Sequence, residues 1–130
     1  MSFGTHLMLD CQTNRKDLLN DMSFIYQVLN ELPDSIGMTK IIPPYVFPYS
    51  GKVPEDKGVT GIVIIAESHL TIHTFSDKDY LFCDIFSCNS FDVERATAHL
   101  IQAFEVHSHE RHVADRGRHF PRTNGEPSNV

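Results

Sequence analysis

The sequence predicts an α+β fold, a two-layer sandwich in which an antiparallel sheet carries two helices on one face. Two patterns lead to this prediction: period-two apolar alternation, typical of half-buried strands, and apolar positions at helical spacing in two segments. They follow one another in the order strand, helix, several strands, helix, strand. The chain has 130 residues, 41% of them hydrophobic, so it suits a single domain over 1–130 with a buried core.

The first strand and the first helix are expected near the N-terminus. In the strand, the apolar residues Leu7, Leu9 and Cys11 occupy every second position and share one face. A helix is predicted over 14–32, where apolar residues recur at steps of three and four. Thr13 or Asn14 is its expected cap, and Pro33 is expected just past its end.

The middle of the chain combines a proline-rich segment with the strongest strand signal. Four prolines interrupt the apolar residues between 38 and 58, which favours an edge strand and a loop: Pro43, Pro44, Pro48 and Pro54. The β-branched run that begins at Gly61 predicts one strand over 61–74. Residues 76–79 form a turn signal, and 80–87 are expected to return as the second strand of an antiparallel hairpin.

The C-terminal part is predicted to hold the second helix and a last strand. Ser90 or Asp92 is the expected helix cap. The following apolar positions share one helical face: Val93, Ala96, Leu100, Ile101 and Phe104. A last strand is expected over 106–113, and 116–130 form a polar tail.

Composition limits the compartment and the class of partner. A formal charge of −6 argues against a general nucleic-acid binder, which carries a basic surface. Three cysteines without a CxxC pair argue against a disulfide framework and indicate a reducing compartment. The N-terminus lacks the features of a signal peptide, and no apolar run reaches the roughly 20 residues of a membrane span. We therefore expect a cytoplasmic protein with neither nucleic-acid nor membrane partners.

Three sequence blocks carry chemical information. They are G-V-T-G at 58–61, A-E-S-H-L-T-I-H-T at 66–74 and D-I-F-S-C at 84–88. Together they resemble the prokaryotic S-adenosylmethionine decarboxylase proenzymes, small pyruvoyl-dependent enzymes that supply aminopropyl groups for spermidine and polyamine synthesis. The resemblance runs from Thr5 to about Phe104, and the block around Ser68 is its most specific part.

The resemblance implies that the precursor cuts its own chain. The Ser68 hydroxyl would attack the carbonyl of Glu67, and elimination would leave a pyruvoyl cofactor derived from Ser68. The products would be a β chain, 1–67, and an α chain, 68–130. In the family a hydroxyl and a histidine support this processing, and the matching residues are Thr60 and His73; Thr60 stands where the family has serine but keeps the hydroxyl.

The resemblance also implies the mature reaction. A substrate amine would form a Schiff base with the pyruvoyl ketone and lose CO2, while the protein orients the carboxylate and returns a proton. Cys88 is the implied proton donor, and His73 would assist. Phe75 stands where the family often has tryptophan, so the resemblance implies an aromatic surface there for an adenine or a sulfonium.

The predicted hairpin supports part of this site independently. A turn centred on 77–79 places Ser68 opposite Cys88 within about one residue, at a facing Cβ separation of roughly 5 Å. Ser68 and His73 have opposite parity, so a regular strand would send them to opposite faces. We therefore expect a bulge or kink after His69.

The C-terminal histidines suggest a metal site as an alternative. They are His107, His109, His112 and His119. On an alternating strand His107 and His109 share a face while His112 takes the other, so a solvated surface is favoured and no metal is expected.

Three functional alternatives stay open beside S-adenosylmethionine decarboxylation. The substrate could be another amino acid such as ornithine or arginine, because the processing block does not define specificity and the proline-rich segment 43–54 departs from the expected connection. The chain could be an unprocessed paralogue that binds a ligand or regulates a partner, or the histidines could bind metal. The family resemblance implies a symmetric homodimer of processed protomers.

Overall fold

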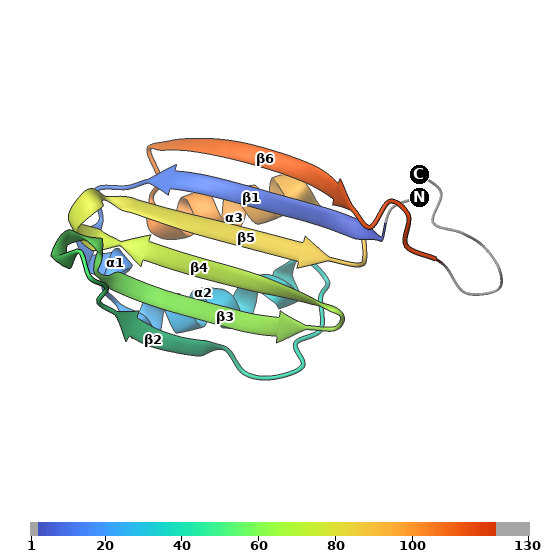
Figure 1. The fold of residues 1–130 in the computed structure, drawn as a ribbon, viewed down its shortest axis with the longest axis horizontal. Coiled ribbons are helices and arrows are strands. Elements are labelled where there is room, and N and C mark those ends of the chain that lie inside the picture. The colour runs from blue at the N-terminus through green and yellow to red at the C-terminus, as the bar shows by residue number, and fades with distance from the viewer. Residues whose placement is uncertain (1–2, 122–130) are drawn as a thin grey trace.

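The protein consists of two layers, a six-stranded sheet and a set of helices that covers one of its faces (Figure 1). The computed structural model describes residues 3–121. The predicted α+β sandwich is confirmed, with one additional short helix before the first long one.

The elements follow in the order β1 (Gly4–Gln12), α1 (Lys16–Leu19), α2 (Met22–Ser35), β2 (Tyr45–Tyr49), η1 (Pro54–Asp56), β3 (Gly58–Ile65), β4 (Ser68–Phe75), η2 (Ser76–Lys78), β5 (Tyr80–Ser87), α3 (Val93–Phe104) and β6 (Ser108–Arg116). The strand order is β2-β3-β4-β5-β1-β6, and all neighbours are antiparallel. The proline-containing β2 lies at an edge, as predicted.

The core lies between the helices and the sheet face that they cover. Alternate strand residues point into it, including Leu7, Leu9, Val63, Leu70, Ile72, Leu81 and Ile85. The helices contribute Ile25, Leu29, Leu32, Ala96, Leu100 and Phe104. Each large apolar side chain buried here contributes about 1.5–3 kcal/mol relative to exposure, so the spacing of these residues fixes which sheet face meets the helices.

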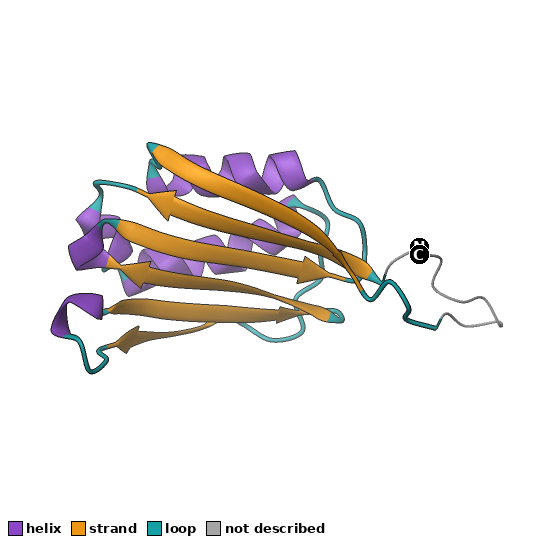
Figure 2. Ribbon diagram, turned by 45° about the horizontal axis from the view of Figure 1, so that its top comes forward, coloured by secondary structure: helices purple, strands orange, loops and turns teal. Residues whose placement is uncertain are grey.

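In the described part of the chain, no helix covers the other face of the sheet (Figure 2). We call this the open face. Its side chains come from the alternate strand positions and include exposed aromatic residues such as Tyr45, Phe47 and Phe82. Thr60 and His73 also lie on this face, because their neighbours Val59 and Thr74 point into the core.

The helix predicted over 14–32 was wrong in its start, continuity and end. The helical conformation is interrupted between α1 and α2. The Asp21 side chain accepts a hydrogen bond from the Phe24 amide at 3.0 Å. Asp21 therefore caps a new helix, because it satisfies a first-turn N–H. Pro33 lies inside α2, which continues to Ser35.

The single strand predicted over 61–74 was also wrong, because the chain reverses in its middle. β3 ends at Ile65, Ala66 and Glu67 form a tight turn, and β4 begins at Ser68. Glu67 has φ = 64°, a left-handed conformation that is unusual for a residue with a side chain. The hairpin between β4 and β5 was predicted correctly.

The C-terminal elements agree with the sequence in kind. The Asp92 side chain accepts from the Arg95 amide at 3.0 Å and caps α3, one of the two predicted caps. Thr13, predicted as a helix cap, is buried and donates its hydroxyl hydrogen to the Phe104 carbonyl at 2.7 Å. The last strand was expected over 106–113 but is shifted toward the C-terminus as β6, which includes Arg116. Most of the predicted tail, 122–130, lies outside the described residues.

Candidate active site

The Glu67–Ser68 peptide bond lies at the end of the tight turn between β3 and β4. The turn is held from outside the hairpin, since the Ala66 amide donates to the Thr39 carbonyl at 2.9 Å. The Ile41 amide donates in the same way to the Ile64 carbonyl at 2.9 Å. The segment after α2 therefore supports the turn, while the left-handed conformation of Glu67 costs about 1–2 kcal/mol.

The Ser68 hydroxyl lies beside the carbonyl group that precedes it. Ser68 Oγ donates to the Glu67 carbonyl oxygen at 2.5 Å and accepts from the Cys88 amide at 2.8 Å. Only 9% of the Ser68 surface is exposed. The hydroxyl is thus held in place between the turn and the end of β5, next to the carbonyl group that it would attack.

Cys88 follows β5 and lies against the same turn. Its Sγ is 3.6 Å from Glu67 Oε1 and 3.8 Å from the Ala66 carbonyl oxygen. The ladder pairs His69 with Phe86, so Ser68 comes within one residue of Cys88, as the hairpin predicted. Burial raises the pKa of the Cys88 thiol, and the neighbouring Glu67 carboxylate raises it further.

The other two cysteines belong to the core. Cys11 and Cys83 are buried between the sheet and the helices. Burial, with a smaller contribution from Asp10, raises the pKa of Cys11 to about 11. Burial also raises the pKa of Cys83 well above its usual range. Cys88 is therefore the cysteine whose surroundings give reagents access.

Thr60 and His73 form a second pair on the open face. They are opposite each other in the β3–β4 ladder, and Thr60 Oγ1 lies 3.2 Å from His73 Nδ1. β3 and β4 approach closely here, because a Cβ on Gly58 would lie 1.7 Å from the Thr74 carbonyl oxygen. The absence of a side chain at Gly58 therefore helps to keep this pair in register.

The Ser68–Cys88 contact and the Thr60–His73 pair lie at opposite ends of β4. Ser68 and His73 are five residues apart, which corresponds to about 16 Å along a strand. The β4–β5 ladder is regular from His69 to Phe75, so the bulge or kink expected after His69 was wrong. Ser68 faces the helices and His73 faces outward, and one protomer does not bring them together.

Phe75 lies near the Thr60–His73 pair and lines a small pocket of about 260 Å³. Its ring meets Phe82 edge-on at 5.8 Å between centroids, and Tyr80 lies 5.1 Å from Phe82. Asp56 and Lys78 complete the lining and form an ion pair at 2.9 Å. The pocket offers aromatic surfaces beside an ion pair, an environment that suits a flat ligand.

Comparison with known proteins places these features in a family. The profile of the family described as S-adenosylmethionine decarboxylase matches residues 5–117. The chain belongs to this family of decarboxylases. The match spans both the Glu67–Ser68 turn and the Thr60–His73 pair.

Relatives and a solved structure support the assignment. The chain is similar to the S-adenosylmethionine decarboxylase proenzyme of Archaeoglobus fulgidus, with 31% identity over 118 residues, 90% of this chain and 100% of the relative. The proenzyme of Thermotoga petrophila is 33% identical over 118 residues, 85% of each chain. A crystal structure of adenosylmethionine decarboxylase from Aquifex aeolicus has a TM-score of 0.71 at 24% identity, covering 89% of this chain and 92% of that one, and shows a shared fold.

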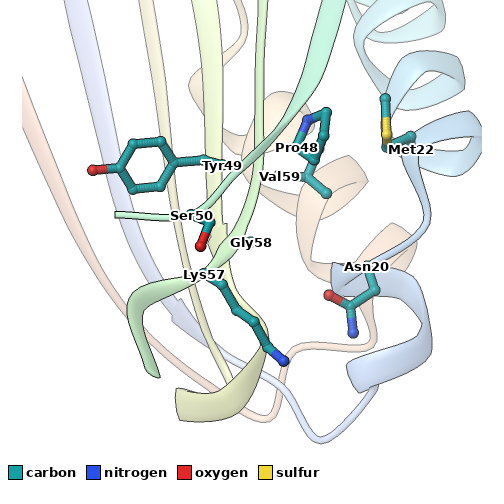
Figure 3. A pocket seen from close by; sticks show the side chains of 8 residues that line it. All are labelled: Asn20, Met22, Pro48, Tyr49, Ser50, Lys57, Gly58 and Val59. Carbon is teal, nitrogen blue, oxygen red and sulfur yellow. The ribbon is translucent and has the colours of Figure 1, made fainter. Parts of the chain in front are cut away.

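A larger pocket is lined by none of the predicted site residues. Its volume is about 500 Å³, and it lies between the α1–α2 junction and the edge of the sheet formed by β2 and β3 (Figure 3). Its lining includes Asn20, Met22, Tyr49 and Lys57. The lining does not include the Glu67–Ser68 bond or Cys88, so we do not place the active site there.

The C-terminal histidines do not converge. Within residues 3–121, no group of three or more His, Cys, Asp and Glu side chains is arranged to hold a metal ion. His109 and His112 lie on opposite faces of β6, as their spacing predicted, while His107 precedes the strand.

Sequence reasoning missed two features of the open face and the turn. The Glu67 side chain contacts Cys88, although only its carbonyl had been assigned a role. His6 Nε2 lies 3.5 Å from Asp84 Oδ1, and His6 and His69 both pack against Phe86. The period-two pattern of β1 was the available signal, because it placed His6 on the face that carries these groups.

Proposed function

We propose that this chain is a self-processing, pyruvoyl-dependent S-adenosylmethionine decarboxylase that supplies the aminopropyl donor for spermidine and polyamine synthesis. One observation carries the proposal: the Ser68 hydroxyl is held 2.5 Å from the Glu67 carbonyl oxygen at a turn with a left-handed residue. This geometry suits an acyl shift, because the nucleophile is already beside its target and the peptide is conformationally strained.

Cleavage proceeds by bond changes within the chain. Ser68 Oγ attacks the Glu67 carbonyl carbon, and the C–N bond breaks to leave an ester and a free amine. Loss of the Ser68 α-hydrogen then breaks the ester bond and releases the Glu67 carboxylate. The dehydroalanine at position 68 tautomerises, and water hydrolyses it to a pyruvoyl group with loss of ammonia. The products are chains 1–67 and 68–130.

Thr60 and His73 are proposed to serve this processing, with His73 as the acid or base. Within one protomer they lie about 16 Å from Ser68 and on the opposite face. A symmetric homodimer packed through the open face, with the strands of the two sheets running in opposite directions, would bring the partner subunit's Thr60 and His73 to the end of the sheet that carries the Glu67–Ser68 turn. The exposed aromatic residues of this face, such as Phe82 at 39%, favour such packing.

The residues fit a pyruvoyl group at position 68, since Ser68 is largely buried, accepts from the Cys88 amide and follows Glu67, whose side chain contacts the Cys88 thiol. When formed, that ketone supplies an electron sink for decarboxylation of an amine-bearing substrate. Cys88 is the proposed proton donor to the substrate carbon, because its Sγ lies against the same turn and carries a proton at neutral pH. The Phe75 pocket is proposed as a surface for the adenine or the sulfonium.

A cytoplasmic location is part of the proposal. The thiols of Cys11, Cys83 and Cys88 are free, which fits a reducing compartment. Among the described residues, no helix is long and apolar enough to cross a membrane.

Intact-mass measurement of the purified protein tests the processing step. We expect two fragments divided between Glu67 and Ser68, and a carbonyl on the second fragment that hydrazine or a hydride reagent traps. The Ser68→Ala variant should remain one chain and trap nothing. A wild-type chain that stays whole after long incubation would instead indicate an unprocessed binding or regulatory paralogue.

Release of labelled CO2 tests the substrate. The processed protein is incubated separately with carboxyl-labelled S-adenosylmethionine, ornithine and arginine. We expect release from S-adenosylmethionine and none above background from the other two. Release from ornithine or arginine alone would keep the cofactor and replace the substrate.

A further inference from the structure

The contact between Glu67 and Cys88 is not explained by the cleavage reaction. Cys88 Sγ lies 3.6 Å from Glu67 Oε1 and 3.8 Å from the Ala66 carbonyl oxygen. Both partners are hydrogen-bond acceptors. A thiol can donate to them, whereas a thiolate would face two oxygen atoms that repel it.

Cleavage changes the charge at this position. The Glu67 carbonyl oxygen lies 2.5 Å from Ser68 Oγ, which accepts from the Cys88 amide at 2.8 Å. When the peptide bond breaks, this carbonyl becomes an α-carboxylate. The processed enzyme therefore holds two carboxylates of one residue beside Cys88, where the precursor holds one.

We propose that Glu67 is a positioning residue for Cys88: its side-chain carboxylate, joined after cleavage by its new α-carboxylate, accepts the thiol hydrogen and keeps Cys88 protonated until it donates. In the donation the S–H bond breaks and a C–H bond forms at the substrate carbon that has lost CO2. The resulting thiolate takes a proton from water. This role rests on the proposed function, but the coupling between Glu67 and Cys88 does not.

Among the described residues, Glu67 is the charged side chain with a hydrogen-bond contact to the Cys88 sulfur, and the other groups nearby are neutral or more distant. β4 contributes the Ser68 hydroxyl, and β1 contributes the backbone of Gly4, which would collide with Cys88 if it carried a Cβ. Further along the open face, the titratable side chains His6 and His69 flank Phe86. The thiol pKa is raised first by burial and then by Glu67, while the Ser68 hydroxyl and the Cys88 backbone lower it by less.

A cycle of four proteins tests the coupling: wild type, Glu67→Gln, Ser68→Ala and the double variant. Iodoacetamide labelling of the Cys88 peptide is followed by mass spectrometry from about pH 7 to pH 10, so labelling of Cys11 and Cys83 is counted separately. We expect Glu67→Gln to label roughly threefold faster at pH 8 in both backgrounds. We expect the processed wild type to label more slowly than Ser68→Ala.

Matched variants separate position from net charge. Glu94→Gln removes another exposed carboxylate, on α3, where it pairs with Arg111 at 2.8 Å, and should leave Cys88 labelling unchanged. Glu67→Asp should retain part of the slow labelling. In the processed enzyme, Glu67→Gln should also shift the alkaline limb of the kcat profile to lower pH.

Each failure has its own signature. Equal labelling profiles for Glu67→Gln and its parent in both backgrounds would overturn the inference while leaving cleavage and CO2 release intact. An uncleaved wild-type chain would overturn the proposed function and with it the donor role of the thiol. The side-chain contribution would still be read from the Glu67→Gln pair.

Discussion

Thr60 Oγ1 lies 3.2 Å from His73 Nδ1, and this pair is held on the open face of the sheet while Ser68 faces the helices. The hydroxyl fixes the orientation of the imidazole ring, because one ring nitrogen is engaged and the other is left for a partner. The family that the sequence resembles has serine at this position, so this chain differs from it by the methyl group of Thr60.

The Thr60 hydroxyl is predicted to accelerate cleavage. Thr60→Val keeps the shape of the side chain and removes the hydroxyl, so we expect cleavage at least about tenfold slower, within the range of acid–base effects. Thr60→Ser retains the hydroxyl and should cleave at nearly the wild-type rate. The rate is measured as the loss of full-length chain by mass spectrometry after synthesis. Equal rates for Val and Ser would exclude a role for this hydroxyl.

The left-handed conformation of Glu67 is predicted to destabilise the precursor. In the Ser68→Ala background, which keeps the chain whole, Glu67→Gly should raise the free energy of unfolding by about 1 kcal/mol, because glycine adopts φ = 64° without strain. Ala66→Gly is the matched control and should lower stability, since φ at Ala66 is not positive. Urea denaturation measures both. A loss of stability in Glu67→Gly would contradict strain at the turn.

The sequence predicted the juxtaposition of Ser68 and Cys88 but not the turn between Ala66 and Glu67. Residues 76–79 carry polar turn formers, so the hairpin and its register followed directly. Ala66 and Glu67 are neither glycine, asparagine nor aspartate, and strand-type patterns continue on both sides of them. The turn therefore depends on support from the segment after α2, which a local pattern does not reveal.

The expected bulge after His69 failed for a different reason. It was introduced so that Ser68 and His73 could meet within one chain. The structure keeps a regular ladder, in which residues of opposite parity stay on opposite faces. The alternation of faces along the strand was thus the reliable signal, and it keeps Ser68 and His73 apart within this chain.

Gly4 is predicted to position Cys88 by allowing β1 to approach β5 closely. A Cβ at Gly4 would lie 1.9 Å from the Ser87 carbonyl oxygen and 2.9 Å from Cys88 Cα. Both are backbone atoms, so Gly4→Ala should cost about 1–3 kcal/mol and displace the residue that follows β5. Gly51→Ala is the control, because its new Cβ meets the movable end of Tyr49. Thermal unfolding and Cys88 labelling of both variants, in the Ser68→Ala background, check this. Equal changes in unfolding temperature and in Cys88 labelling for Gly4→Ala and Gly51→Ala would contradict this role of Gly4.

The open face is predicted to make stability depend on pH through His69. Burial, followed by the charges of His6 and Arg116, lowers the pKa of His69. The folded state therefore binds fewer protons than the unfolded state, so His69 reduces stability as pH falls from the ordinary histidine value of about 6.5 toward its lowered value. His69→Gln removes this loss.

The measurement for His69 is urea unfolding in the Ser68→Ala background at about pH 7.5 and about pH 5.5. We expect His69→Gln to gain stability relative to its parent at the lower pH. His112→Gln removes an exposed histidine from β6 and is the matched variant. The same change with pH for both variants would remove His69 as the cause.

The separation of Ser68 from His73 predicts that cleavage can be restored between two inactive chains. His73→Asn should not cleave, because every protomer lacks the processing histidine, and Ser68→Ala should not cleave, because it lacks the nucleophile. When the two are co-expressed, a mixed dimer combines an intact Ser68 with an intact His73 across the interface. The His73→Asn chain should then be cut while the Ser68→Ala chain stays whole, which distinguishing affinity tags and intact mass resolve. Co-expression of two tagged His73→Asn chains is the control. Cleavage of His73→Asn alone would exclude His73 from processing, and no cleavage in the mixed dimer would place the supporting histidine in the same chain as the serine.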